Sequence, residues 1–170
     1  MGTYIRIKHR QNTSGNSYDY AYLVQWNSNP VYGHQKHLRY LGKVYSFIQT
    51  HPHIPHLINH ALPVQALIKE LLRVELLRHG FRRHIHNLYT HSSYFVDLDH
   101  GTVYSSITKE VVLQLNAGYL CTHTLQNLFN TETPLPLTPI QTFVTTLALQ
   151  GIDLTQDELI DLHHALTHQI

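Results

Sequence analysis

The first 44 residues alternate apolar and polar side chains with a period of two, and this constrains the fold more than any other feature of the chain. Three runs carry the pattern, Thr3–Arg10, Tyr18–Trp26 and Gln35–Val44, and short polar segments separate them. Connections this short join antiparallel neighbours. The sequence therefore predicts a three-stranded antiparallel sheet at the N-terminus.

Cationic side chains repeat along one side of these predicted strands. In the first run Ile5 and Ile7 alternate with three basic residues, which predicts a core face and a solvent face. In the third run the same alternation predicts an apolar row on one face of the strand and a basic row on the other. The predicted core-facing residues are Ile5, Ile7, Leu38, Tyr40 and Val44, and the predicted outward-facing basic residues are Arg6, Lys8, Arg10, His37, Arg39 and Lys43.

The middle run holds a row of tyrosines whose direction the pattern leaves open. Tyr18, Tyr20 and Tyr22 lie on one face, and Ala21 and Leu23 lie on the other. If the tyrosines share the basic face, the sheet is a stacking platform for single-stranded nucleic acid. If they face the core, the sheet is a ribbon suited to duplex DNA. The predicted nucleic-acid contacts are Arg6, Lys8, Arg10, Tyr20, Tyr22, Lys36, Arg39, Lys43, Arg82 and Arg83.

The remainder of the chain mixes helix and strand signals. Pro63 to about His79 is the clearest helix, with Gly80 as its stop and with Glu70–Arg73 and Glu75–Arg78 pairs on its wet side. A hairpin is expected at 94–105, a segment ambiguous between strand and helix at 110–120, and a short helix from 121. A helical hairpin closes the chain, and Thr155 and Glu158 form a capping box at its second helix.

These elements indicate an α+β fold, in which the N-terminal sheet packs on the central helix. We divide the chain into a basic sheet module, 1–62, and a mixed α/β part, 63–170. The alternative is a single domain over 1–170.

Charge is distributed unevenly along the chain. Residues 1–90 contain eleven Lys and Arg against three acids, whereas residues 91–170 contain one, Lys109, against eight. A basic half with a net charge of +8 favours a polyanion such as DNA or RNA, and the acidic half, at −7, favours a basic protein partner. The two halves also neutralise each other if they pack together or meet in a homodimer. A protein-binding regulator is thus the main alternative to nucleic-acid binding.

A known pattern covers about the first 45 residues. Tyr20, Leu23 and Val24 are followed by Gly33, and then by Lys36, Arg39 and the run Leu41-Gly42-Lys43. This segment resembles the N-terminal module of IS1634-type transposases and their DDE relatives. The resemblance implies association with DNA and with a mobile or foreign genetic element. The catalytic domain of that family is much longer than the rest of this chain, so we carry over no transposase activity.

Metal and enzyme chemistry have weaker support in the sequence. Asp97, Asp99 and Glu110 are the best carboxylate set for a magnesium-dependent nuclease, our second alternative, but Asp99 falls in a predicted turn, where Asp is favoured for backbone reasons. Sixteen histidines include the group His51, His53, His56 and His60, which lacks a carboxylate or cysteine nearby. We therefore predict no cofactor, no metal and no catalytic residue.

Compartment and membrane association are read from composition. The single cysteine, Cys121, excludes an intrachain disulfide, and no run of about 18 apolar residues is present. The N-terminus lacks the apolar segment of a secretory signal. We expect a cytoplasmic protein without a membrane-spanning segment.

Overall fold

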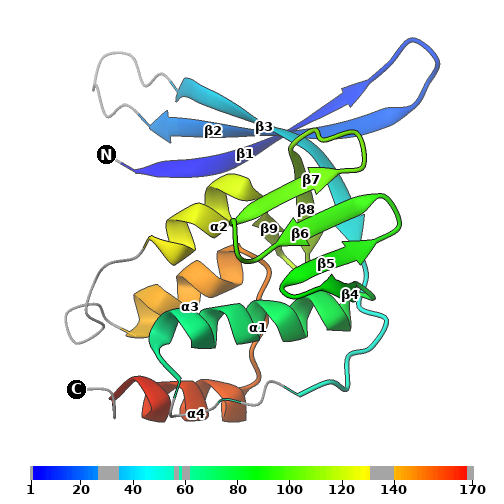
Figure 1. Cartoon of the computed structure of the whole chain (residues 1–170). Helices are drawn as coiled ribbons and strands as arrows, with labels where there is room; N and C mark the ends of the chain where they lie inside the picture. Colours follow the sequence, from blue (N-terminus) through cyan, green and yellow to red (C-terminus); the bar gives the residue numbers. More distant parts are fainter. Residues whose placement is uncertain (1, 27–34, 56–57, 59–61, 131–139, 168–170) are drawn as a thin grey trace.

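The computed structural model describes residues 2–26, 35–55, 58, 62–130 and 140–167. These contain both helices and strands, so the predicted α+β class is confirmed. Figure 1 shows long strands along the top of the molecule, a smaller sheet to the right and helices below. None of the described helices has the length and apolar character that crossing a bilayer requires.

The larger sheet is mixed and contains five strands. β1 (Thr3–Gln11), β2 (Ser17–Trp26) and β3 (Gln35–Phe47) form the predicted antiparallel meander. β8 (Val111–Leu115) then pairs in parallel with the end of β3, and β9 (Gly118–Leu120) lies at the edge. Segments on both sides of residue 62 therefore share one sheet.

The smaller sheet is an antiparallel meander of four short strands in chain order. β6 (Tyr94–Asp97) and β7 (Thr102–Ser105) are the predicted hairpin. β4 (Arg82–Ile85) and β5 (Leu88–His91) were not predicted, because His86 takes a left-handed backbone conformation at φ 45° between two short runs of weak strand pattern. The ambiguous segment at 110–120 forms the β8–β9 hairpin.

The central helix, α1 (Val64–Arg78), matches its prediction and carries the main core. Gly80 ends it with a φ of 80°, which a side chain with a Cβ atom rarely adopts. Glu70 and Arg73 pair at its half-buried surface, as expected. The Glu75–Arg78 pair does not lie on the wet side as predicted, because Glu75 is 0% and Arg78 6% exposed.

Three further helices complete the fold: α2 (Thr122–Phe129), α3 (Ile140–Leu149) and α4 (Gln156–Thr167). The predicted capping box at α4 is confirmed. The backbone N–H of Thr155 donates to Glu158 Oε2 at 2.7 Å, and that of Glu158 donates to Thr155 Oγ1 at 3.3 Å. Glu158 also accepts a hydrogen bond from Arg78, which ties α4 to α1.

Candidate nucleic-acid interface

The pairing of β1 with β2 settles the direction of the tyrosine row. Arg6 lies opposite Tyr22, Lys8 opposite Tyr20, and Arg10 opposite Tyr18. Residues directly opposite in an antiparallel pair project from the same face of the sheet. The basic row and the tyrosine row therefore share one face, whereas Ile5 and Ile7 share the other with Leu23 and Ala21.

Two bulges in β3 then rearrange the predicted rows. The first bulge is at Leu38: its neighbours His37 and Arg39 pair with Val24 and Leu23, which leaves Leu38 without a partner on β2. The second bulge is at Leu41: its neighbours Tyr40 and Gly42 pair with Tyr22 and Ala21. Each extra residue reverses the in-and-out alternation of the strand. His37, Tyr40 and Lys43 consequently join the face of the tyrosine row. We call this surface the basic aromatic face, made of Arg6, Lys8, Arg10, Tyr18, Tyr20, Tyr22, His37, Tyr40 and Lys43.

The bulges place two predicted contacts on the opposite face. Arg39 is in register with Leu23, and Lys36 with Gln25. Arg39 donates to Glu110 at 2.8 Å, which holds its guanidinium against the start of β8. Arg39 and Lys36 therefore do not belong to the basic aromatic face, contrary to the expected single row of His37, Arg39 and Lys43.

The opposite face carries a small apolar cluster. Ile5, Ile7 and Val44 lie in it as predicted, together with buried residues of β8 and the start of α2. It contains no described residue of α1. The part of the meander that packs against the core cluster of α1 is the end of β3, at Tyr45 and Phe47, and not the predicted Ile5, Ile7 and Val44. The prediction that Leu38 and Tyr40 face the core is wrong, because they are 42% and 51% exposed. Leu38 is the residue of the first bulge, and Tyr40, between the two bulges, lies on the face of Tyr22.

Rings and cations contact one another across the basic aromatic face. Lys43 Nζ lies 3.5 Å from the ring centre of Tyr18, and Lys8 Nζ lies 5.1 Å from that of Tyr22. The Tyr40 ring packs 5.4 Å from Tyr22 and 6.3 Å from Tyr20. These contacts restrict the side chains of this face relative to one another. Burial raises the pKa of Tyr40, and its tyrosine neighbours raise it further, so the ring stays neutral.

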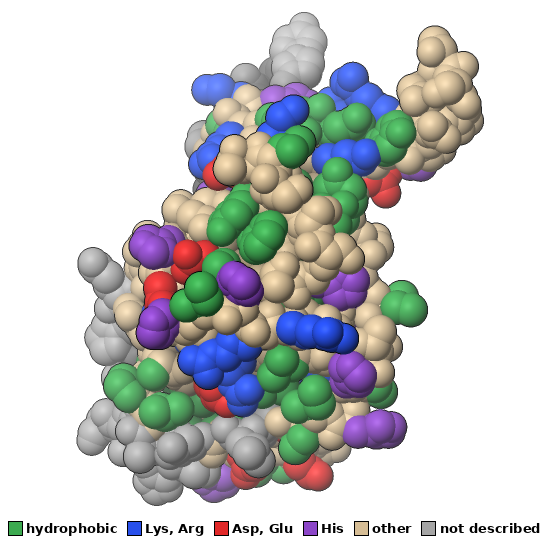
Figure 2. All heavy atoms as spheres, turned by 45° about the vertical axis from the view of Figure 1, so that its right-hand side comes forward, with side chains coloured by type: hydrophobic (Ala, Val, Ile, Leu, Met, Phe, Trp, Pro, Cys, Tyr) green, Lys and Arg blue, Asp and Glu red, His purple; other side chains and the backbone are tan. Residues whose placement is uncertain are grey.

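Negative charge is absent from the described strands of this face. The one acid in β1, β2 and β3 is Asp19, which points to the opposite face with its partner His9 at 2.7 Å. Among the described residues no carboxylate pairs with Arg6, Lys8, Arg10 or Lys43. Figure 2 shows Lys and Arg side chains, in blue, interleaved with hydrophobic side chains, in green, over the upper part of the molecule.

Acids of the second half neutralise other cations of the first. Glu110 pairs with Arg39, Asp99 with Lys69 at 3.1 Å, and Glu158 with Arg78 at 3.0 Å. The uneven charge of the sequence is therefore partly cancelled inside the fold.

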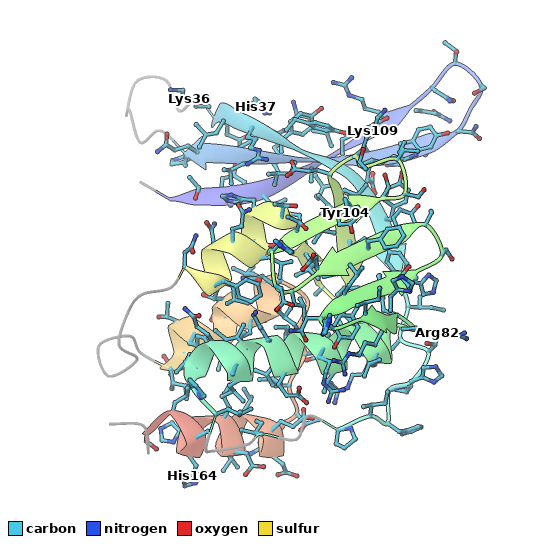
Figure 3. The ribbon with its side chains drawn as sticks, in the orientation of Figure 1. Lys36, His37, Arg82, Tyr104, Lys109 and His164 are labelled. Carbon is cyan, nitrogen blue, oxygen red and sulfur yellow. The ribbon has the colours of Figure 1, made fainter. Side chains whose placement is uncertain are left out.

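Arg82 and Arg83 lie apart from this surface. Both are exposed on β4, in the smaller sheet, and Arg83 donates to the backbone carbonyl of His86. Figure 3 shows Arg82 far below Lys36 and His37 on β3. The two arginines do not extend the face that the other predicted contacts form.

The carboxylates proposed for a nuclease have structural roles here. Asp97 accepts hydrogen bonds from the backbone of Asp99 and His100 at 2.9 and 3.0 Å, which shapes the β6–β7 turn. Asp99 accepts from Lys69 and Asn87, and Glu110 binds Arg39. No group of three potential metal ligands occurs among the described residues. His56 and His60 of the histidine group lie outside the described residues.

Comparison with known proteins adds no relative: no family model matches the chain, and no curated protein or solved structure resembles it significantly. The resemblance of the first 45 residues to a transposase module stays a prediction.

Proposed function

We propose that this protein binds single-stranded nucleic acid through the basic aromatic face. One observation carries the proposal: the β1–β2 register puts Arg6, Lys8 and Arg10 on the same face as Tyr22, Tyr20 and Tyr18. Cations contact the phosphates, while tyrosine rings stack on bases that a single strand leaves unpaired. Association with a mobile or foreign genetic element rests on the sequence resemblance alone.

Strand geometry supports a match to the phosphate backbone. Alternate residues of a strand project from one face about 6.6–7 Å apart, which is near the spacing of phosphates along an extended single strand. Arg6 and Arg10 are exposed, and Lys8 between them is half-buried. Duplex DNA is the less favoured ligand, because the rings of the tyrosine row stand where a duplex ribbon would present small side chains.

A matched pair of double variants tests the proposal. We expect the Arg6→Ala/Lys8→Ala variant to lose most of its affinity for a fluorescein-labelled oligothymidylate, measured by anisotropy over a salt series. Its salt slope falls by about 1.4, since each lost phosphate contact removes about 0.7. The control, Arg82→Ala/Arg83→Ala, removes the same charge from β4 and keeps the wild-type slope. Equal losses in the two variants would mean that only total charge matters, and the proposal would be wrong.

A further inference from the structure

A cavity of about 510 Å³ opens at the end of the basic aromatic face, where the β7–β8 turn approaches it. Its floor comes from β2 and β3, and its wall comes from residues 105–111. The residues that bear on its chemistry are Tyr20, Tyr40, Lys43, Tyr45, Ile107, Lys109 and Glu110. The carboxylate of Glu110 is paired with Arg39 at 2.8 Å.

Lys109 contributes a positive charge to this cavity. It is the single Lys or Arg of residues 91–170, and the fold places it in the same cavity as Lys43 of β3. Figure 3 shows Lys109 at the level of the β1–β3 strands rather than with the helices. Among the described residues no carboxylate forms an ion pair with Lys109.

The turn that carries Lys109 is held by hydrogen bonds. The backbone N–H of Ser105 donates to the carbonyl of Lys109 at 2.9 Å, and that of Thr108 donates to the carbonyl of Ser105 at 2.8 Å. Thr108 takes a φ of 57°, which lets the chain reverse. The wall is thus a defined structure, and Ile107 stands 66% exposed at its rim.

We infer that this cavity holds one nucleotide of the bound strand. The phosphate lies between the ammonium groups of Lys43 and Lys109, and the base stacks on the exposed ring of Tyr40, with Ile107 covering its edge. Two cations and several rings line one concave site, and the acid among its lining residues, Glu110, is neutralised by Arg39. The site therefore suits the charge and the apolar surface of a nucleotide, and its volume lies in the range of small-ligand sites. This inference rests on the proposed function.

Lys109→Ala is the test, because Lys109 belongs to the cavity and not to the three strands. We expect this variant to bind the labelled oligothymidylate more weakly, with a salt slope reduced by about 0.7. The control, Lys69→Ala, removes one cation from α1 and leaves the slope unchanged. If Lys109→Ala keeps the wild-type slope while Arg6→Ala/Lys8→Ala loses binding, the cavity does not hold a nucleotide, and the proposed function is unaffected. Absence of binding by the wild-type protein would instead overturn the proposed function.

Photocrosslinking locates the base independently. An oligonucleotide that contains 5-iodouracil is irradiated with the wild-type protein, and the modified tyrosines are identified by mass spectrometry. Crosslinks at Tyr40 or Tyr45 support the cavity. Crosslinks confined to Tyr18 and Tyr22 would place every base on the open sheet and overturn it.

Discussion

Lys43 lies over the ring of Tyr18, with its ammonium nitrogen 3.5 Å from the ring centre. The two residues come from different strands, β3 and β2, so this contact ties the second bulge of β3 to the tyrosine row. An ammonium group has three donors, and the ring face occupies one side of it. Lys43 can therefore keep this contact while it donates to a phosphate.

Replacement of Lys43 tests how much this contact contributes to stability. We expect Lys43→Met to lower the free energy of unfolding by about 0.5–1 kcal/mol, the range of an exposed cation–π contact. Urea denaturation followed by circular dichroism measures this loss. Lys43→Arg keeps both a cation and a planar group that stacks on the ring, so it serves as the control. A Lys43→Met variant as stable as wild type would show that the contact contributes nothing.

Gly42 is a position where the fold has no room for a side chain. Its φ is 137°, and a Cβ atom there would lie 2.7 Å from the carbonyl oxygen of Glu110. We expect Gly42→Ala to destabilise the protein by about 3 kcal/mol, because both the backbone conformation and the close approach of β8 oppose it. Thermal unfolding gives the measurement.

The matched control for Gly42→Ala is Gly15→Ala in the β1–β2 turn. Gly15 also has a positive φ, 83°, but nothing lies within 4 Å of its Cβ position. Only the conformational cost remains, about 1 kcal/mol. Similar losses in the two variants would contradict the tight packing of β3 against β8.

Arg78 holds three parts of the chain at a buried site. Its guanidinium donates to Glu158 at 3.0 Å and to the backbone carbonyls of Ile54 and Asp153 at 2.7 and 3.0 Å. We expect Arg78→Met to cost about 3–5 kcal/mol, because it leaves buried carboxylates without their cation. Arg73→Met, at a half-exposed pair, should cost about 0–1 kcal/mol. Denaturant titration of both variants distinguishes the two sites, and equal costs would refute the distinction.

The hydrogen bonds that Asp97 accepts predict that the stability of the protein falls at acid pH. Partial burial opposes its ionisation, but hydrogen bonds from His100 and Asp99 outweigh this, and the pKa of Asp97 is lowered. A lowered pKa in the folded state means that the stabilisation is present above the unfolded value, about 3.9, and is lost as the pH falls through the folded pKa. Asp97→Ala should therefore cost about 2 kcal/mol at pH 7 and less as the pH falls below about 4.

The control for this pH dependence is Asp161→Ala, at an exposed position of α4. We expect its unfolding free energy to follow that of the wild type across the same pH series. A constant difference between Asp97→Ala and wild type at every pH would contradict a role for the ionised carboxylate.

Local patterns in the sequence predicted much of this fold. The meander, α1, the β6–β7 hairpin and the capping box of α4 follow from periodicity and from single residues such as Pro63, Gly80 and Thr155. Each of these signals acts between residues close in sequence, where a pattern and a structure correspond directly.

The features that depend on distant contacts were not predictable. Nothing in the sequence of β3 indicates that it bulges at Leu38 and Leu41. A strand without bulges puts Arg39 outward and Tyr40 toward the core, and both predicted directions were therefore wrong. The local pattern predicts Glu75 as a surface residue of a helix, but Arg78, Asn116 and the backbone of Asp153 contact it. The cavity beside Lys109 needs the parallel pairing of β3 with β8, which joins segments that no local signal connects.

That parallel pairing can form only late in the synthesis of the chain. β1, β2 and β3 emerge from the ribosome first, whereas β8 follows only after α1 and the smaller sheet have been made. Until then the free edge of β3 between Lys43 and Phe47 exposes unpaired backbone groups to other chains. Nascent chains stalled before Val111 should therefore aggregate or recruit chaperones more readily than chains stalled after Leu120.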